Sequence, residues 1–239
     1  MVPHGEGVFE TLKVLESQPC VLSRHLDRLC RSASELGLPV PDVAQIAREV
    51  EAHLRAHPHT LGRMRITWAA GPSAPILSIE SATTAPPKPT VALTLSNWRI
   101  DASSPLSGLK TTNYVDYAAA LRAAQSAGFD EALLANTKGD ICETATANVF
   151  YVLDGVIHTP PLSSGCLPGI ARELVLEMCD VVEVAAPPEV LGSATEVFVT
   201  SSLREVQPVS GIDEWAYSTT GPKTSDLINA WRRHANGPM

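Results

Sequence analysis

The segment Gly108–Tyr114 reads GLKTTNY. Its lysine, Lys110, is the candidate reactive amine on which the interpretation of the chain depends. Two later segments complete the pattern: Glu143–Phe150 reads ETATANVF, and Leu167–Arg172 reads LPGIAR. Together they contain an amine, a carboxylate between apolar residues and a helix start that contains glycine. These are the groups needed to hold an aldehyde cofactor that carries a phosphate. The pattern therefore suggests pyridoxal 5'-phosphate (PLP) as the cofactor.

The composition limits the classes of protein to consider. The chain has 239 residues, of which 44% are hydrophobic, so it can bury one large core or two modest ones. Its formal net charge is -8 with no basic run, which argues against a nucleic-acid or anionic membrane surface. No apolar segment approaches the ~20 residues that span a bilayer, and Met1–Gly5 lacks the pattern of a signal peptide. We therefore expect a cytoplasmic protein that binds neither nucleic acid nor membrane.

The cysteines give no sign of a metal site. There are five of them, an odd number, scattered without a CxxC motif or a His/Cys cluster at metal-ligand spacing. A structural zinc site or a disulfide framework is therefore not expected. Reduced thiols, buried or partly buried, suit a cytoplasmic protein.

Hydrophobic periodicity predicts helices mixed with β-hairpins, which is typical of an α/β or α+β enzyme. Before residue 100 we expect helices over 23–36 and 42–57 and strands over 7–14, 20–22, 63–69, 76–80 and 91–98. After residue 108 we expect helices over 115–127, 169–179 and 220–234 and strands over 131–135, 148–153, 156–159, 181–185 and 196–200. The polar segment 101–108 is the predicted linker between an N-terminal domain over 1–100 and a C-terminal domain over 109–239.

Lys110 stands out among the five lysines of the chain. Lys88 and Lys223 lie beside prolines and Lys138 lies in a turn, where an amine is solvated. Lys110 follows an apolar residue at the start of an element and has few charges nearby. Desolvation and a cationic neighbour lower the pKa of an amine in such a place, which keeps it nucleophilic enough to form a Schiff base. The alternative is an exposed lysine that follows a linker.

Glu143 follows Ile141 and Cys142 and precedes small residues, so its carboxylate is expected in a poorly solvated position. A buried carboxylate needs a partner. A pyridinium N–H is a suitable partner, because the ion pair keeps the ring protonated and able to accept electrons. A surface glutamate on a strand is the alternative interpretation.

A phosphate needs hydrogen-bond donors, and three parts of the sequence offer them. Leu167–Ile170 places proline and glycine at a helix start, where free N–H groups and the helix dipole bind anions. Thr200–Ser202 follows an apolar strand and supplies hydroxyls, and Arg28 on the first helix supplies a guanidinium. Each feature taken alone is more often a helix cap, a turn or a surface charge. Their occurrence together with Lys110 and Glu143 supports a phosphate site.

The same segments resemble the class IV aminotransferases, the fold-type IV PLP family that includes branched-chain aminotransferases, D-amino acid aminotransferases and aminodeoxychorismate lyases. The resemblance follows the family order over nearly the whole chain. Besides the segments already quoted, it depends on Gly5–Thr11, His25–Leu29, Asp130–Ala132, Thr159–Leu162 and Phe198–Ser201. It implies a smaller N-terminal α/β domain and a larger C-terminal pseudo-barrel domain with the cofactor between them. It also implies a homodimer in which each active site borrows from the partner subunit.

The resemblance assigns roles to the residues around the cofactor ring. Lys110 would form the Schiff base and move the substrate proton, and Glu143 would pair with the ring nitrogen. Tyr114 is a candidate contact for the phenolic oxygen of the cofactor, with core packing as the alternative. Thr11 is a candidate for the substrate side of the pocket, with an ordinary strand position as the alternative.

The resemblance also assigns the phosphate site. The ligands would be Arg28, the backbone of Ile170 and Ala171, and the side chains of Thr200 and Ser201. The substrate carboxylate has no such assignment, because residues 66–71 read ITWAAG where many lyases carry an Arg-Gly pair. Arg63, Arg65 and Arg99 are the candidates for that anchor.

Asn113, three residues after Lys110, resembles the lyase and D-amino acid branches more than the branched-chain branch. The predicted function is therefore a lyase of the folate pathway that eliminates pyruvate from 4-amino-4-deoxychorismate to give 4-aminobenzoate. A transaminase for a small branched-chain or D-amino acid with a 2-oxo acid acceptor is the alternative, because it shares the removal of the α-proton. A non-catalytic homologue that only binds a ligand is a third possibility.

Overall fold

The structure is a computed structural model that describes residues 7–235. The chain divides into two compact units. The smaller unit comprises Met1–Pro87 and Leu109–Tyr114, and the larger unit comprises Lys88–Gly108 and Val115–Met239. Among the described residues, no helix combines the length and the apolar character that crossing a bilayer requires.

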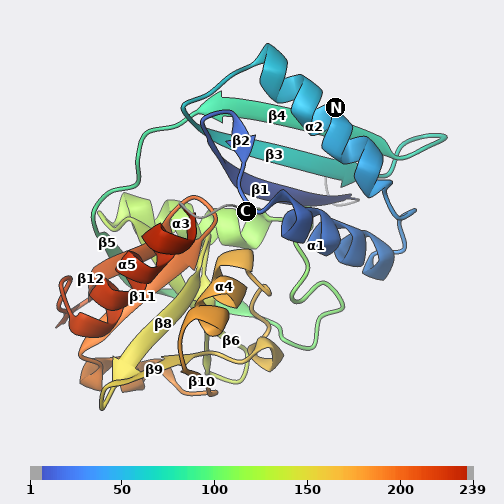
Figure 1. Ribbon diagram of the computed structural model, residues 1–239. Coiled ribbons are helices and arrows are strands. Elements are labelled where there is room, and N and C mark those ends of the chain that lie inside the picture. Colours follow the sequence, from blue (N-terminus) through green and yellow to red (C-terminus); the bar gives the residue numbers. More distant parts are fainter. Residues whose placement is uncertain (1–6, 236–239) are drawn as a thin grey trace. The chain divides into compact units, whose positions relative to one another are not determined.

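The smaller unit is a four-stranded antiparallel sheet with two helices on one face (Figure 1). The strand order is β2-β1-β3-β4, with β1 Gly7–Leu15, β2 Gln18–Pro19, β3 Leu61–Ala69 and β4 Ile76–Thr83. The helices are α1 Leu22–Glu35 and α2 Val43–Ala56. Apolar residues at helical spacing in the helices and at alternate positions in the strands form one core, which includes Leu12, Leu26, Leu29, Val50 and Met64.

The segment Leu109–Tyr114 belongs to the smaller unit because it pairs with the start of β1. The N–H of Phe9 donates to the carbonyl of Lys110 at 2.8 Å, and the N–H of Thr112 donates to the carbonyl of Gly7 at 2.7 Å. The backbone of Lys110 is therefore held along the edge of β1.

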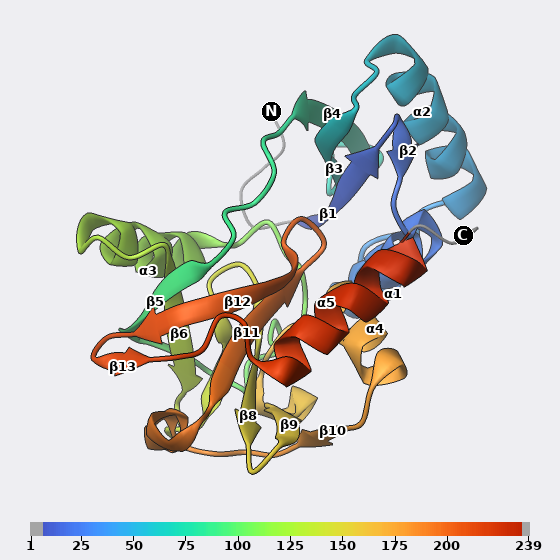
Figure 2. The same ribbon diagram turned by 60° about the vertical axis from the view of Figure 1, so that its left-hand side comes forward.

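The larger unit is built on a curled mixed sheet (Figure 2). The strand order is β10-β9-β8-β11-β12-β5-β6-β7, and β13 pairs with β12. The strands are β5 Val91–Ile100, β6 Glu131–Asn136, β7 Ile141–Thr144, β8 Asn148–Leu153, β9 Val156–Thr159, β10 Val181–Glu183, β11 Glu196–Ser201, β12 Glu205–Ile212 and β13 Trp215–Ala216.

Among the described residues, three α-helices pack on this sheet. Helix α3 Val115–Ser126 packs on β5 and β6, α4 Ile170–Met178 packs on β11, and α5 Pro222–Ala235 packs on β11 and β12. Two short 3-10 helices, Leu162–Ser164 and Pro188–Ser193, lie in the connections. The predicted fold class, a smaller α/β part with a larger pseudo-barrel part of fold type IV, is confirmed.

The unit boundaries differ from the predicted domains at two places. Strand β5 pairs in parallel with β6 and β12, so it belongs to the larger unit and not to a domain over 1–100. Leu109–Tyr114 belongs to the smaller unit and not to a domain over 109–239. Both segments pair with strands that are distant in the sequence, and a boundary inferred from local composition cannot detect such pairing.

Two local predictions near α1 also differ from the structure. The strand paired with the end of β1 is Gln18–Pro19 and not 20–22, because Glu16 and Ser17, with φ of 46° and 59°, form a two-residue hairpin turn. Helix α1 begins at Leu22, one residue before the predicted start, and its N-cap position is taken by Val21, which has a left-handed conformation.

Candidate active site

In the smaller unit, Lys110 lies against two aromatic rings. Its Nζ is 4.6 Å from the ring centroid of Phe9 and 5.6 Å from that of Tyr114. The two rings meet edge to face, with centroids 5.7 Å apart and planes at 82°. Lys110 is partly buried, so the alternative of an exposed lysine is wrong. The two rings therefore form an apolar border beside the amine.

A second cationic side chain, that of Arg65, also contacts the ring of Phe9. Cζ of Arg65 on β3 lies 3.7 Å from its centroid, and Thr11 is the residue paired with Arg65 across β1 and β3. Val8 and Leu12 belong to the core under the helices, so Phe9 and Thr11 lie on the opposite face of the sheet. Burial lowers the pKa of Arg65. A poorly hydrated guanidinium that stays charged is a suitable anchor for a carboxylate.

Arg28, a predicted phosphate ligand, forms a buried ion pair in the smaller unit. Its Nε and Nη2 donate to the two carboxylate oxygens of Glu10 at 2.7 and 2.6 Å, and Nδ1 of His25 lies 2.6 Å from Oε2 of Glu10. Burial by itself raises the pKa of Glu10, but the charge of Arg28 and the hydrogen bonds from Arg28 and His25 lower it to about 2. Glu10 therefore occupies one edge of the guanidinium, and the phosphate role of Arg28 stays a prediction.

In the larger unit, Glu143 is buried on β7, with 5% of its surface exposed. The hydroxyl of Tyr117 on α3 donates to Oε1 at 2.8 Å, and the N–H of Leu167 donates to Oε2 at 3.1 Å. The side-chain amide of Asn148 contacts Oε2 at 3.4 Å and donates to the carbonyl of Leu167 at 2.9 Å. Hydrogen bonds to both oxygens favour the ionised carboxylate. The interpretation of Glu143 as a surface residue is therefore wrong.

Three predicted phosphate ligands lie around Asn148. Helix α4 begins at Ile170 after Gly169, which provides no side-chain cap, so the first-turn N–H groups, including that of Ala171, have no partner within the helix. A Cβ on Gly169 would lie 2.0 Å from Oδ1 of Asn148, so any larger residue would force the side chain of Asn148 to move. Asn148 pairs with Thr200 across β8 and β11, and Oγ1 of Thr200 is buried without a hydrogen-bond partner among the described residues. A helix N-terminus beside an unsatisfied buried hydroxyl fits a phosphate group.

Ser201, the remaining predicted phosphate ligand, is partly buried at the end of β11. Its Oγ accepts a hydrogen bond from the N–H of Arg204 at 3.2 Å, within the turn that leads to β12. The structure therefore places Ser201 next to Thr200 and shows its hydroxyl supporting the turn, and its phosphate role stays a prediction.

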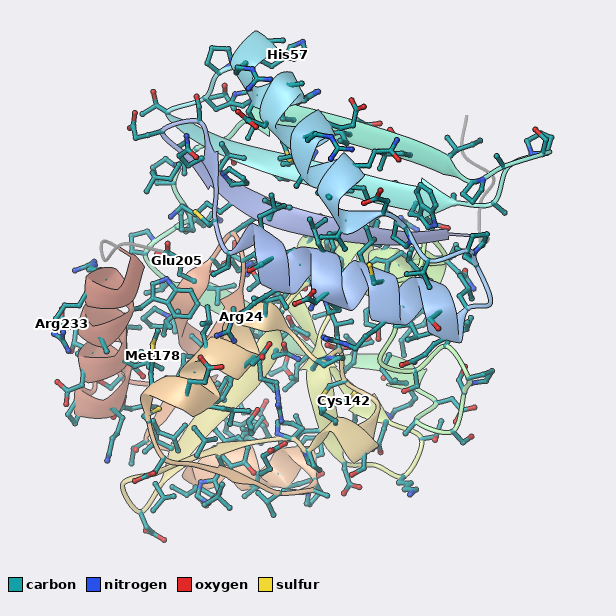
Figure 3. The ribbon with its side chains drawn as sticks, turned by 45° about the vertical axis from the view of Figure 1, so that its right-hand side comes forward. Arg24, His57, Cys142, Met178, Glu205 and Arg233 are labelled. Atoms are coloured by element: carbon teal, nitrogen blue, oxygen red, sulfur yellow. The ribbon has the colours of Figure 1, made fainter. Side chains whose placement is uncertain are left out.

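The thiols next to the Glu143 site are poor nucleophiles. Cys142, labelled in Figure 3, is buried on β7, and Cys166 is buried beside Leu167. Burial, together with the charge of Glu143, raises the pKa of Cys142 far above its usual range and that of Cys166 to about 11. All five cysteines are free thiols.

Each unit thus holds part of the predicted site. Lys110, Tyr114 and Thr11 lie around Phe9 and Arg65 in the smaller unit, and Glu143, Ile170, Ala171 and Thr200 lie around Asn148 in the larger unit. Sequence reasoning missed Tyr117, Asn148 and Glu10 as site residues. Asn148 and Glu10 stand inside the segments that carry the family resemblance, which was the available signal. Nothing local distinguishes Tyr117 from other tyrosines at the start of a helix.

Comparison with known proteins identifies the family. The profile of the family described as amino-transferase class IV matches residues 7–212, which is most of the chain. The protein belongs to the class IV aminotransferases. As a class IV aminotransferase it is an enzyme that uses PLP, so the predicted family, enzyme class and cofactor are confirmed.

Relatives of this class IV aminotransferase include proteins named as branched-chain aminotransferases and one named as 4-amino-4-deoxychorismate lyase. A Methanocaldococcus jannaschii protein provisionally named branched-chain-amino-acid aminotransferase is 29% identical over 237 residues, covering 88% of this chain and 80% of the relative. A Legionella pneumophila crystal structure provisionally named 4-amino-4-deoxychorismate lyase has a TM-score of 0.91 and 28% identity, covering 96% of this chain and 91% of that chain. The branched-chain aminotransferase of Thermoproteus uzoniensis, solved with norvaline, has a TM-score of 0.90 and 27% identity, covering 97% of this chain and 86% of that chain.

Proposed function

We propose that the protein is a transaminase for a branched-chain or similarly small amino acid, with a 2-oxo acid as amino acceptor. The observation that carries the proposal is the position of Lys110 and Arg65 on the ring of Phe9. The ring of Phe9 offers an apolar surface beside the amine, and Arg65 on the same ring offers an anchor for a substrate carboxylate. The names of the curated relatives support the same choice. The prediction from sequence placed the lyase first because of Asn113. We place the transaminase first.

The residues around the cofactor ring would then have separate tasks. Bound PLP supplies a conjugated ring that withdraws electrons from the substrate α-carbon. Nζ of Lys110 would hold the cofactor aldehyde, and as a free amine it would take the proton from the α-carbon of the substrate. Glu143, oriented by Tyr117 and the N–H of Leu167, would keep the ring nitrogen protonated. The rings of Phe9 and Tyr114 would border the amine with apolar surface.

The phosphate would be bound mainly from the larger unit. The buried hydroxyl of Thr200 and the N–H groups of Ile170 and Ala171 would supply donors, and the missing side chain at Gly169 leaves room for Asn148 beside the helix start. Ser201 adds a hydroxyl. Arg28 adds a positive charge whose position is fixed by Glu10.

Arg65 is the preferred anchor for the substrate carboxylate among the three arginines considered from the sequence. Arg63 is exposed, and Nη1 of Arg99 donates to the carbonyl of Ser96 at 2.5 Å. Arg65 is partly buried and shares the ring of Phe9 with the reactive amine. Thr11, paired with Arg65, would line the same side of the substrate pocket.

Two assays on purified protein supplied with PLP test the proposal. One contains L-leucine with 2-oxoglutarate, and the other contains 4-amino-4-deoxychorismate. Formation of glutamate in the first assay supports the transaminase. Formation of 4-aminobenzoate and pyruvate in the second, without glutamate in the first, overturns it. Lys110→Ala should remove both the activity and the near-visible absorption band that borohydride also abolishes, whereas Lys138→Ala, in an exposed turn, should keep both.

The lyase is the second candidate, because the Legionella structure with that name superposes over 96% of this chain. Both reactions begin with removal of the α-proton by the same amine, so Lys110 itself serves either, whereas the apolar ring of Phe9 beside it favours a small apolar amino acid. A protein that stays folded but colourless with PLP would contradict both candidates. A homodimer is also proposed from the family resemblance, and a monomer in sedimentation analysis would contradict it.

A further inference from the structure

Glu131 on β6 is a fully buried carboxylate that the proposed reaction does not use, with 0% of its surface exposed. Its Oε2 accepts hydrogen bonds from the hydroxyl of Thr146 at 2.5 Å and from Nη2 of Arg204 at 2.7 Å. Its Oε1 accepts one from the N–H of Ala132 at 3.2 Å. Nη2 of Arg204 also donates to Oγ1 of Thr146 at 3.2 Å, so the three side chains form one closed network.

The two partners of Glu131 come from two turns. Thr146 lies in the turn between β7 and β8, three residues after Glu143. Arg204 lies in the turn between β11 and β12, four residues after Thr200. Glu131 therefore connects the turn that follows the ring-nitrogen ligand to the turn that follows a phosphate ligand.

The turn that carries Arg204 needs support from side chains. Glu205 at its end, labelled in Figure 3, has a φ of 59°, a left-handed conformation that is unfavourable for a residue with a Cβ. Arg204 supplies support within the turn, because its N–H donates to Oγ of Ser201 at 3.2 Å and its Nη1 donates to Oε1 of Gln207 at 3.3 Å. The bond from Arg204 to Glu131 then fixes the supported turn to β6.

Burial makes this network sensitive to the loss of either partner. Burial raises the pKa of Glu131, while the charge of Arg204 and the hydrogen bond from Thr146 act in the opposite direction. Removal of the cation leaves a buried carboxylate without compensation, which is strongly unfavourable. The turns would then move until Glu131 reached water or another donor.

We propose that Glu131, Thr146 and Arg204 are positioning residues that fix the spacing between Glu143 and Thr200. The inference rests on the proposed function, because it takes these two residues as ligands of one cofactor. The ring nitrogen and the phosphate are separated by a fixed covalent framework. Ligands carried by two separate strand ends therefore need a rigid connection to bind both groups at once.

Two matched pairs of variants test the proposal. Thr146→Val removes the hydroxyl at nearly constant volume, and Thr146→Ser retains it. Arg204→Met removes the cation and keeps an unbranched side chain. Lys88→Met is its control, because Lys88 forms an exposed ion pair with Asp130, the residue before Glu131.

The first readout needs no cofactor. Amide hydrogen exchange of the apoprotein should become about tenfold faster in residues 144–147 and 200–205 for Thr146→Val and Arg204→Met. Thr146→Ser and Lys88→Met should keep the wild-type rates. Unchanged exchange in both turns overturns the inference, and so does an equal acceleration over the whole larger unit, which would indicate a general loss of stability.

The second readout concerns the cofactor. The Kd for PLP should rise about tenfold in Thr146→Val and Arg204→Met, and the phosphorus NMR signal of bound PLP should shift. Faster exchange with unchanged Kd and phosphorus signal would overturn the positioning role. A wild-type protein that binds no PLP would refute the proposed function, whereas the exchange rates would still decide whether the three side chains hold the two turns.

Discussion

Asn148 and Thr200 are paired across β8 and β11, and the side-chain amide of Asn148 reaches from this pair to Glu143 and to the carbonyl of Leu167. One asparagine therefore connects the strand end with the unsatisfied threonine hydroxyl, the buried carboxylate and the segment before α4. Gly169 makes this possible by leaving space for the asparagine.

Gly169→Ala is expected to weaken PLP binding and to destabilise the fold, because the added Cβ would lie 2.0 Å from Oδ1 of Asn148. Overpacking of this kind costs about 1–3 kcal/mol. Thermal unfolding and PLP titration measure the two effects. Combining the change with Asn148→Ala removes the steric conflict, so the double variant should lose less stability than the sum of the single variants. Additive losses would contradict this explanation.

Tyr117→Phe is expected to weaken PLP binding by about 10–100-fold with the fold retained. The change removes the hydroxyl that donates to Oε1 of Glu143 at 2.8 Å, and a hydrogen bond to a charged group is worth about 1.5–3 kcal/mol. Absorption titration measures the affinity. Tyr217→Phe is the matched control, since its hydroxyl donates to the carbonyl of Leu191 at 3.2 Å. Equal losses in the two variants would refute the role assigned to Tyr117.

Glu10→Gln is expected to lower the free energy of unfolding by about 3–5 kcal/mol at neutral pH, because it leaves the buried guanidinium of Arg28 without its counter-ion. The effect depends on pH with a defined sign. The pKa of Glu10 in the folded protein is about 2, below its usual 4.5, so the stabilisation is complete above pH 4.5 and is lost as pH falls toward 2. Urea unfolding over this interval should show a wild-type loss of about 3 kcal/mol from this group. If the variant lost as much, Glu10 would not be its source.

Arg65→Met is expected to reduce kcat/KM for the amino acid substrate by about 10–100-fold, mainly through KM, because the substrate carboxylate loses a charged partner. Arg65→Lys should recover part of the loss. Arg63→Met, an exposed residue on the same face of β3, is the control. Steady-state kinetics with several amino acids measure the effect. Similar kinetics for Arg63→Met and Arg65→Met would argue for a general effect of positive charge.

The sequence alone was sufficient to predict features that are set by residues adjacent in the chain. Pro168 and Gly169 indicated a helix start, and α4 does begin at Ile170. Apolar neighbours indicated a buried position for Glu143, which the structure confirms. In such cases the chain on either side determines the solvation of the residue, so a single sequence carries the necessary information.

Partners that come from distant strands and helices could not be predicted in the same way. Arg28 was expected to face a phosphate, but one edge of its guanidinium binds Glu10, which is contributed by β1. Tyr117 reaches Glu143 only because α3 packs beside β6, the neighbour of β7. The membership of β5 in the larger unit likewise depends on parallel pairing with β6 and β12. These contacts depend on sheet order, which local composition does not encode.

The pairing of Leu109–Tyr114 with the start of β1 has a consequence for how the chain folds during synthesis. The first sheet is translated with one edge of β1 unpaired, and the segment that pairs with this edge is translated only after β5, the first strand of the other unit. Until then, the donors of Phe9 and the acceptors of Gly7 must be satisfied by solvent. The nascent protein thus places Lys110 beside Phe9 and completes that edge of the sheet in the same step.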